Sequence, residues 1–417
     1  MANQLLTTSK ITMNALEILE NQLTFSDNIN RDYDDQFTGG GGKIGATVNV
    51  RKPARNVVTV GQALQPQSSV ETYVPVTLTT QAHVDLSFSS VDLSLSIDDF
   101  KARFISPAMA ALANKIDYDG LQLYKKVYNH VGTVGQLTGT PTQLQAITAI
   151  AQAGQRLDEM AAPKDGKRSA IINPSTQTGL VTAQASLFNP QQAVSDMYKN
   201  GRMGANVLGF DFYQDQNVAM HTAGTHNSTF ATTNAAQGGG NTVQADATTA
   251  FALVTAAVTG TLTEGTVFTI AGVYSVNPQS RQSTGSLQNF VVTADTLAGA
   301  TTVNIAPYPI FNGAFQNVTS STNSIGVSAT CTILSGLNGA QAPQNMFMHK
   351  NAFTLACADL PLPKGVNEAA RASSKAAGLS LRMISQYDIQ SDNFFSRIDV
   401  LYGYKALYPE LSVRLCG

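Results

Sequence analysis

The stretch RIDVLYGYKALYPELSVRL, Arg397–Leu415, decides much of the fold because apolar and polar residues alternate along it. The apolar face of the extended chain would carry Ile398, Val400, Tyr402 and Tyr404. This two-residue period predicts a β-strand. Pro409 cannot donate to a β-ladder, so it ends the run or places it at a sheet edge. GLSLRMISQYDIQ, residues 378–390, alternates in the same way, and the C-terminal part is therefore predicted to be rich in strands.

Helical periods appear earlier in the chain. Residues 11–24 have the apolar spacing of a short amphipathic helix. Ser106 followed by Pro107 favours a capped start for a longer helix over residues 107–130, which we expect to end near Gly132 and Gly135. A further helix is predicted over 142–160, and it is followed by a short buried strand, RSAIINP.

The composition changes sharply near Ala223. From there to about Asn345 the chain is dominated by Thr, Ser, Asn, Gly and Ala. The charged residues of this block are Asp246, Glu264, Arg281 and Asp295. Apolar runs such as TVFTIAGVYSV and TTVNIAP are separated by turn residues, which is typical of an all-β module. Because mixed helix and strand patterns flank the block, we predict a β-domain inserted into an α+β host.

A run of glycines, Gly39, Gly40, Gly41 and Gly42, precedes Lys43 and resembles a phosphate-binding loop at first sight. The spacing fails, because Phe37 stands where the first glycine is required and Ile44 follows the lysine. Glycine also supplies conformational freedom. We therefore interpret the run as a hinge for the extended segment that follows it.

The segment after the glycines is basic and strand-like. KIGATVNVRKPARNVVTVG, residues 43–61, alternates through its first half and carries Lys43, Arg51, Lys52 and Arg55 with no acidic residue among them. An isolated two-stranded arm is marginally stable alone. We expect this arm to reach a neighbouring subunit.

Bulk properties exclude several classes of protein. The chain has 417 residues, a charged fraction of 13 % and a net charge of -2, so two or more domains are expected and a basic nucleic-acid binder is not. Three scattered cysteines form no disulfide framework. No signal peptide pattern and no apolar run of about 18 residues is present. We expect a soluble protein made in a cytoplasm, without a membrane partner.

Catalytic or metal-binding patterns are weak. His221 and His226 are five residues apart in HTAGTHNST, a loop composition, and we interpret them as part of a solvated domain junction. Asp98 and Asp99 suit the acidic first turn of a helix better than acid–base catalysis. Asp117 and Asp119 are expected on different helix faces. We predict no catalytic, metal or cofactor site, and no enzyme.

Four stretches in order resemble one family. GATVNVRKP is similar to the extended-loop strand of tailed-phage major capsid proteins, the Johnson fold, and IDDFKARFISPAMAALANKID to the start of their spine helix. NVLGFDFYQDQNVAMHTAG resembles the strand that leads to an insertion, and Leu379–Leu415 resembles the closing strands. The likeness is closest to podovirus-type coat proteins with an inserted β-barrel domain.

The resemblance implies an α+β fold with six segments. These are an N-terminal arm (1–37), an extended loop (38–80), a peripheral domain with the spine helix (81–135), an axial domain (136–222), the inserted β-barrel (223–345) and the remainder of the axial and peripheral domains (346–417). It also implies hexamers and pentamers that form an icosahedral shell around double-stranded DNA. The expected location is the virion, assembled in the host cytoplasm.

The resemblance also implies partners. Only about 37 residues precede the glycines, so we expect a separate scaffolding protein, together with a portal protein and, as an open question, a decoration protein. Lys43, Arg51, Lys52 and Arg55 are candidate partners for Asp98 and Asp99 of an adjacent subunit. An extended-loop lysine crosslink, present in some relatives, is not expected here.

Other classes remain as alternatives. The shell of a cellular nanocompartment shares the fold but would enclose enzyme cargo. A surface-layer or adhesive β-protein would suit the Thr/Ser/Asn-rich block, yet it would need an export signal. An enzyme would need a pocket of convergent titratable groups.

Overall fold

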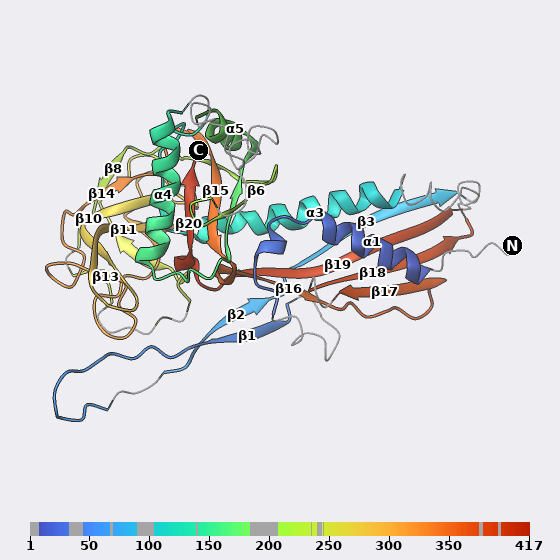
Figure 1. The fold of residues 1–417 in the computed structure, drawn as a ribbon, viewed down its shortest axis with the longest axis horizontal. Helices are drawn as coiled ribbons and strands as arrows, with labels where there is room; N and C mark the ends of the chain where they lie inside the picture. The colour runs from blue at the N-terminus through green and yellow to red at the C-terminus, as the bar shows by residue number, and fades with distance from the viewer. Residues whose placement is uncertain are drawn as a thin grey trace. The chain divides into compact units, whose positions relative to one another are not determined.

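The computed structural model describes residues 8–32, 45–66, 70–89, 104–138, 141–183, 207–234, 236–239, 244, 246–374, 378–390 and 393–417. The chain divides into two compact units. Unit 1 comprises Met1–Val50, Pro75–Gly120 and Phe353–Lys405. Unit 2 comprises Arg51–Val74, Leu121–Ala352 and Ala406–Gly417. Figure 1 traces the elements of both units.

Unit 1 is built on a five-stranded sheet of order β16-β19-β18-β17, in which β3 also pairs with β19. Its strands are β3 (Thr80–Ser89), β16 (Phe353–Ala358), β17 (Glu368–Ser374), β18 (Leu379–Asp388) and β19 (Asn393–Ala406). Antiparallel register joins β18 to β19, with Met383 opposite Ile398. Both predicted C-terminal strands are therefore present, although β19 is buried on both faces from Ile398 to Gly403.

Two helices pack on this sheet (Figure 1). Helix α1 (Thr8–Gln22) lies against β17 and β18 and is followed by the 3-10 helix η1 (Ser26–Asn28). Helix α3 (Ser106–Leu121) contacts β19 through the Tyr402 hydroxyl, which donates to Asp119 Oδ2 at 2.7 Å.

The predicted end of the long helix is wrong. The α-helix stops at Leu121 rather than near residue 130, and the chain continues as the 3-10 helix η5 (Gln122–Lys126) and the short strand β4 (His130–Val131). Lys126 Nζ lies 2.8 Å from Glu264 Oε1, 138 residues away, so a contact invisible to local periodicity holds the tightened turn. The chain passes from unit 1 to unit 2 at this point.

The first part of unit 2 is a six-stranded mixed sheet of order β4-β20-β15-β5-β6, with β7 paired to β15. Its other strands are β5 (Arg168–Ile172), β6 (Asp211–Gln214), β7 (Met220–Thr222), β15 (Gln341–His349) and β20 (Ser412–Cys416). Helix α4 (Gln143–Glu159) packs against β20, and α5 (Pro174–Ala183) packs against α4. A capping box between Thr142 and Gln145 starts α4, which lies within the helix predicted over 142–160.

The second part of unit 2 is the Thr/Ser-rich block, which forms a seven-stranded sheet of order β8-β14-β10-β11-β12-β9 with β13 paired to β10. The strands are β8 (Thr229–Ala231), β9 (Phe251–Val254), β10 (Val267–Val276), β11 (Ser283–Val292), β12 (Thr302–Ala306), β13 (Val318–Thr319) and β14 (Thr330–Ile333). Its two edges are joined by a bridge between Thr232 and Thr255. Phe268 and Phe290 lie in the core of this part, and we refer to it as the inserted sheet.

A two-stranded sheet pairs β1 (Thr47–Lys52) with β2 (Thr72–Thr77). Residues 53–66, which follow β1, form a long loop, visible in Figure 1. Two further 3-10 helices, η7 (Lys350–Ala352) and η8 (Pro409–Leu411), precede β16 and β20. Pro409 occupies the start of η8, so it ends the long strand run as predicted.

Candidate assembly surface

The loop between β1 and β2 exposes apolar side chains. Val58, Val60 and Leu64 are 87, 96 and 90 % exposed. Single exposed apolar residues are ordinary on protein surfaces. Three of them within seven residues of one extended segment form a patch of the kind that marks an interaction site. We call residues 53–66 the loop segment.

The cations at the base of the loop segment bind different partners. Arg51 is 83 % exposed and lies 3.7 Å from Glu71 on the neighbouring strand end. Lys52 Nζ donates to the carbonyl of Leu407 and lies 4.3 Å from the centre of the Tyr408 ring. Lys52 thus anchors the loop base within its own chain, whereas Arg51 remains accessible to another molecule.

Arg55 is also held within the chain. Its guanidinium lies 3.4 Å from Glu410 Oε1 and 5.6 Å from the centre of the Phe315 ring in the inserted sheet. Burial raises the pKa of the Tyr128 hydroxyl well above its usual value, and the Glu410 carboxylate adds to that rise. Asn129 Nδ2 donates to the carbonyl of Glu410 at 3.2 Å, which fixes the backbone that carries this carboxylate.

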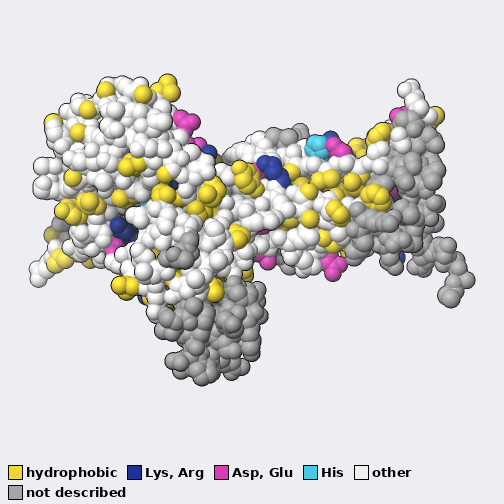
Figure 2. Space-filling model, turned by 90° about the horizontal axis from the view of Figure 1, so that it is seen from above, with side chains coloured by type: hydrophobic (Ala, Val, Ile, Leu, Met, Phe, Trp, Pro, Cys, Tyr) yellow, Lys and Arg dark blue, Asp and Glu magenta, His cyan; other side chains and the backbone are white. Residues whose placement is uncertain are grey.

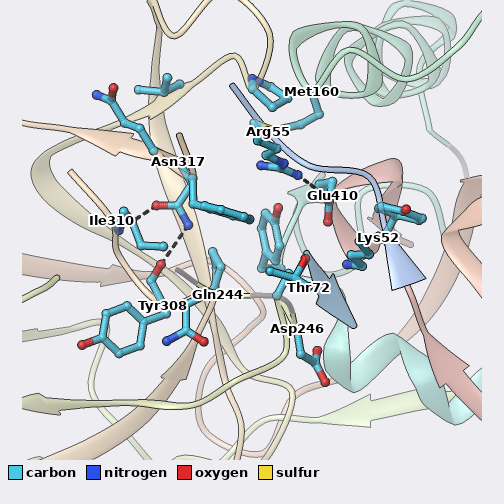
Figure 3. Close-up of a pocket in the computed structure, with 18 of the residues that line it drawn as sticks. Lys52, Arg55, Thr72, Met160, Gln244, Asp246, Tyr308, Ile310, Asn317 and Glu410 are labelled. Atoms are coloured by element: carbon cyan, nitrogen blue, oxygen red, sulfur yellow. Dashed lines mark hydrogen bonds and ion pairs between the residues drawn. The ribbon is translucent and has the colours of Figure 1, made fainter. Parts of the chain in front are cut away.

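A cavity of about 110 Å³ lies where these groups meet (Figure 3). The base of the loop segment, the turn at residues 407–411 (which we call the C-terminal turn) and the inserted sheet all line this cavity. Figure 3 shows Arg55 pointing toward Glu410, with Lys52 beside them and Asn317 on the opposite wall. Asn317 Nδ2 donates to the carbonyl of Tyr308, and Asn317 Oδ1 accepts from the Ile310 amide, so that wall is fixed by its own hydrogen bonds.

The predicted solvated junction near the start of the inserted sheet is wrong for its two histidines. His221, in strand β7, and His226 are buried, whereas Thr222, Thr225 and Asn227 beside them are exposed. Burial and, after it, the charge of the neighbouring Arg414 together lower the pKa of His221 to about 3. His130 on β4 shows the same effect, with a pKa of about 3 caused first by burial and then by Arg414.

Arg414 joins the two sheets of unit 2. Its Nη2 donates to the carbonyl of Gly265 at 2.9 Å, and its guanidinium lies 5.6 Å from the Tyr124 ring. Tyr124 in turn lies 3.4 Å from His221 Nδ1. Among the described residues no carboxylate pairs with Arg414, so neutral acceptors and an aromatic face hold a buried cation. These contacts make Arg414 a structural joint between the two sheets.

With this geometry established, comparison with known proteins gives the family. The family model described as P22 coat protein, gene protein 5, matches residues 62–417. The chain belongs to the P22 coat protein family. The match covers most of the chain, so the resemblance to tailed-phage major capsid proteins is confirmed.

One curated relative of this P22-type coat protein is a major capsid protein of Acyrthosiphon pisum secondary endosymbiont phage 1. It is 22 % identical over 290 residues, which are 67 % of each chain. A solved structure from Mycobacterium phage Che8 has a TM-score of 0.49 at 12 % identity and covers 94 % of this chain and 91 % of that chain. The capsid structure of the cyanophage P-SCSP1u has a TM-score of 0.45 at 11 % identity, over 94 % of this chain and 88 % of that chain.

Several predicted residues of this coat protein lie outside the described parts of the chain. They are Gly39, Gly40, Gly41, Gly42, Lys43, Asp98 and Asp99. The hinge and the pairing of cations with acids on an adjacent subunit therefore stay predictions. Of the described candidates, the structure brings Lys52 and Arg55 to the cavity and leaves Arg51 on the surface.

A buried carboxylate was missed by the sequence analysis. Asp117 accepts hydrogen bonds from the amides of Thr24, Phe25 and Ser26 and from the Ser26 hydroxyl. It therefore fastens the turn after α1 to α3 inside unit 1. No local signal reveals this role, because its partners are 91 to 93 residues away.

Other kinds of site find no support in the described parts. No group of three or more metal-ligating side chains occurs among the described residues. None of the described helices combines the length and the hydrophobicity needed to cross a lipid bilayer. His83 on β3 is exposed, and its Nδ1 lies 3.0 Å from Asp85 Oδ2.

Proposed function

We propose that many copies of this coat protein assemble into hexamers and pentamers of a closed icosahedral head shell that encloses double-stranded DNA. The observation that carries the proposal is the loop segment, whose exposed apolar side chains need a partner surface. Membership of the P22 coat protein family supports the same conclusion, because a coat protein forms its shell by self-assembly. The loop segment would lie over a neighbouring subunit, with Gly39–Gly42 as its hinge.

The surface charge suits an inner wall beside packed DNA. Charged residues are 13 % of the sequence, and few charged side chains appear on the face shown in Figure 2. A strongly basic wall would bind phosphates tightly and resist release of the genome. A cellular nanocompartment shell is not favoured by the family match, and DNA inside purified particles would distinguish the two functions.

We infer that a separate scaffolding protein guides closure and that a portal protein occupies one vertex. Arg51 and Lys43 would then meet acidic residues such as Asp98 and Asp99 on the adjacent subunit. Exposed ion pairs contribute only about 0–1 kcal/mol each. Such pairs would set the register of subunits more than the strength of their contacts. A decoration protein remains an open partner, and the inserted sheet would form a barrel-like domain on the subunit.

Electron microscopy of the protein expressed with its scaffolding protein tests this function. We expect closed shells of uniform size with the scaffold and open or aberrant ones without it. Val60→Asp should abolish shells while the subunit stays folded, because an exposed apolar side chain costs little to replace in the monomer but much at a buried contact. Uniform shells from the Val60→Asp variant, or a persistent monomer of the parent protein in both conditions, would contradict the proposal.

A further inference from the structure

We propose that the inserted sheet positions the extended loop: Arg281 and Phe315 hold the loop segment at its base and so set the direction in which it leaves the subunit. This positioning role of the inserted sheet rests on the proposed function, in which the loop segment reaches a neighbouring subunit.

The contacts at the loop base come from two sides. On one side, the C-terminal turn supplies Glu410 to Arg55 and the Leu407 carbonyl to Lys52. On the other side, Arg281 of the inserted sheet donates from Nη2 to the carbonyl of Asn56, and the Phe315 ring receives the guanidinium of Arg55. From Val58 to residue 66 every residue of the loop segment is exposed. The contacts with the inserted sheet therefore lie close to the start of this continuously exposed part.

At Arg55, three residues beyond the Lys52 anchor, the C-terminal side gives a weak hold. Arg55 and Glu410 approach to 3.4 Å, which is long for a charge-assisted hydrogen bond. Glu410 Oε2 is buried and has no hydrogen-bond partner among the described residues. Beyond Lys52, the printed contact on this side is thus one long ion pair, and the contacts of Arg281 and Phe315 supplement it in fixing the direction of the following residues.

The turn that presents Arg281 is rigid. Asn277 Oδ1 accepts from the amides of Gln279 and Ser280, and the Arg281 amide donates to the Asn277 carbonyl at 2.8 Å. Asn277 Nδ2 also donates to the carbonyl of Glu159 at the end of α4, at 2.8 Å. The turn between β10 and β11 is thereby tied to helix α4, which packs against β20. This turn can therefore act as a fixed support for the loop segment.

Arg281 occupies a backbone conformation that arginine does not favour. Its φ is 54°, in the left-handed region where glycine and asparagine are the usual residues. A side chain kept at a strained position indicates a use for that side chain. The guanidinium contact with Asn56 supplies that use, and Arg281→Gly should remove the contact while relieving the strain.

Distance measurements between spin labels test the proposal in unassembled subunits. Labels at Val58→Cys on the loop segment and Leu297→Cys on the inserted sheet report on the direction of the loop, and both parent side chains are exposed. The three native thiols are buried, so the reagent will select the introduced ones. We expect a narrow distance distribution for the otherwise unchanged protein. Arg281→Gly combined with Phe315→Leu should broaden it at least twofold.

A matched control separates positioning from general loosening. Arg156 on α4 also donates from Nη2 to a backbone carbonyl of the inserted sheet, that of Leu287 at 3.4 Å, but it does not contact the loop segment. Arg156→Gln should leave the label distribution unchanged. Arg281→Gly alone should broaden the distribution without lowering the melting temperature, because strain is relieved. A purely structural role for Arg281 would instead lower the melting temperature.

Three results would overturn the proposal: a broad distribution in the parent protein, an unchanged distribution in the double variant, or equal broadening by Arg156→Gln. These outcomes are independent of shell formation, because they are measured in the free subunit. Failure of the proposed function would appear separately, as a parent protein that forms no shells with its scaffolding protein. If both hold, the double variant should give fewer closed shells and a wider spread of diameters.

Discussion

Replacement of Asp117 should be among the most destabilising single changes in unit 1. The carboxylate lies on α3, and only 2 % of the residue is exposed. Oδ2 accepts from the Thr24 amide at 2.6 Å and from the Phe25 amide at 3.3 Å. Oδ1 accepts from the Ser26 amide at 3.1 Å and from the Ser26 hydroxyl at 2.6 Å. Burial raises the pKa of this carboxyl, and the hydrogen bonds from residues 24–26 oppose the rise.

The magnitude follows from the donors that lose their acceptor. Asp117→Ala leaves three backbone amides without an acceptor, whereas the Ser26 hydroxyl keeps the Tyr404 hydroxyl at 2.8 Å as a partner. Each unpaired buried amide costs about 1–3 kcal/mol. Entry of water and relaxation of the turn recover part of this sum. We therefore expect a loss of about 3–5 kcal/mol in the free energy of unfolding, the range typical of a broken buried charge network. Asp117→Asn keeps the volume and one acceptor oxygen, so its loss should be smaller.

Urea unfolding of the unassembled subunit, followed by circular dichroism, measures this loss. Asp119→Ala is the control, since this second aspartate of α3 accepts from the Lys115 ammonium at 2.6 Å and from the Tyr402 hydroxyl but serves no buried backbone amide. Its loss should be about 1 kcal/mol. If Asp117→Ala cost no more than Asp119→Ala, the reasoning that Asp117 fastens the turn after α1 would be refuted.

Two further predictions concern the joint in unit 2 and the packing in unit 1. The folded pKa values of His130 and His221 are about 3, below the ordinary value of 6.5, so the unfolded chain binds more protons between these limits. The free energy of unfolding should therefore fall as the pH drops from 6.5 toward 3, by at most about 1.4 kcal/mol per pH unit for each histidine. Urea unfolding at a series of pH values measures this dependence, and the double variant His130→Gln/His221→Gln should show a weaker one. Gly120→Ala should lower the unfolding free energy by about 1–3 kcal/mol, because a Cβ at this position would lie 2.6 Å from the Phe25 ring. A melting temperature equal to that of the parent protein would show that the ring moves aside freely.

Local patterns predicted much of the fold because several elements are set by local chemistry. Thr142 and Gln145 start α4 with a capping box, and Pro409 ends the longest strand run, and both effects act within a few residues. The end of α3 was predicted about nine residues too late, and Lys125 and Lys126 in the turn that follows it contact Glu264, which is distant in sequence. The buried state of His221 was missed for a similar reason, since the Tyr124 ring that packs edge-on against it lies 97 residues earlier.

The candidate assembly residues show the same division between local and distant effects. Four cations without an acid among them suggested one common task, the contact with a neighbouring subunit. The structure separates the described ones, because Lys52 and Arg55 meet Leu407 and Glu410, which come from the last residues of the chain. Arg51 has only an exposed partner at 3.7 Å and stays accessible. A loop that must reach another molecule needs a fixed base as well as a free surface, and adjacent residues of one basic run supply both. Charge-reversal experiments should therefore distinguish Arg51, where assembly alone should suffer, from Arg55, where the loop base itself should loosen.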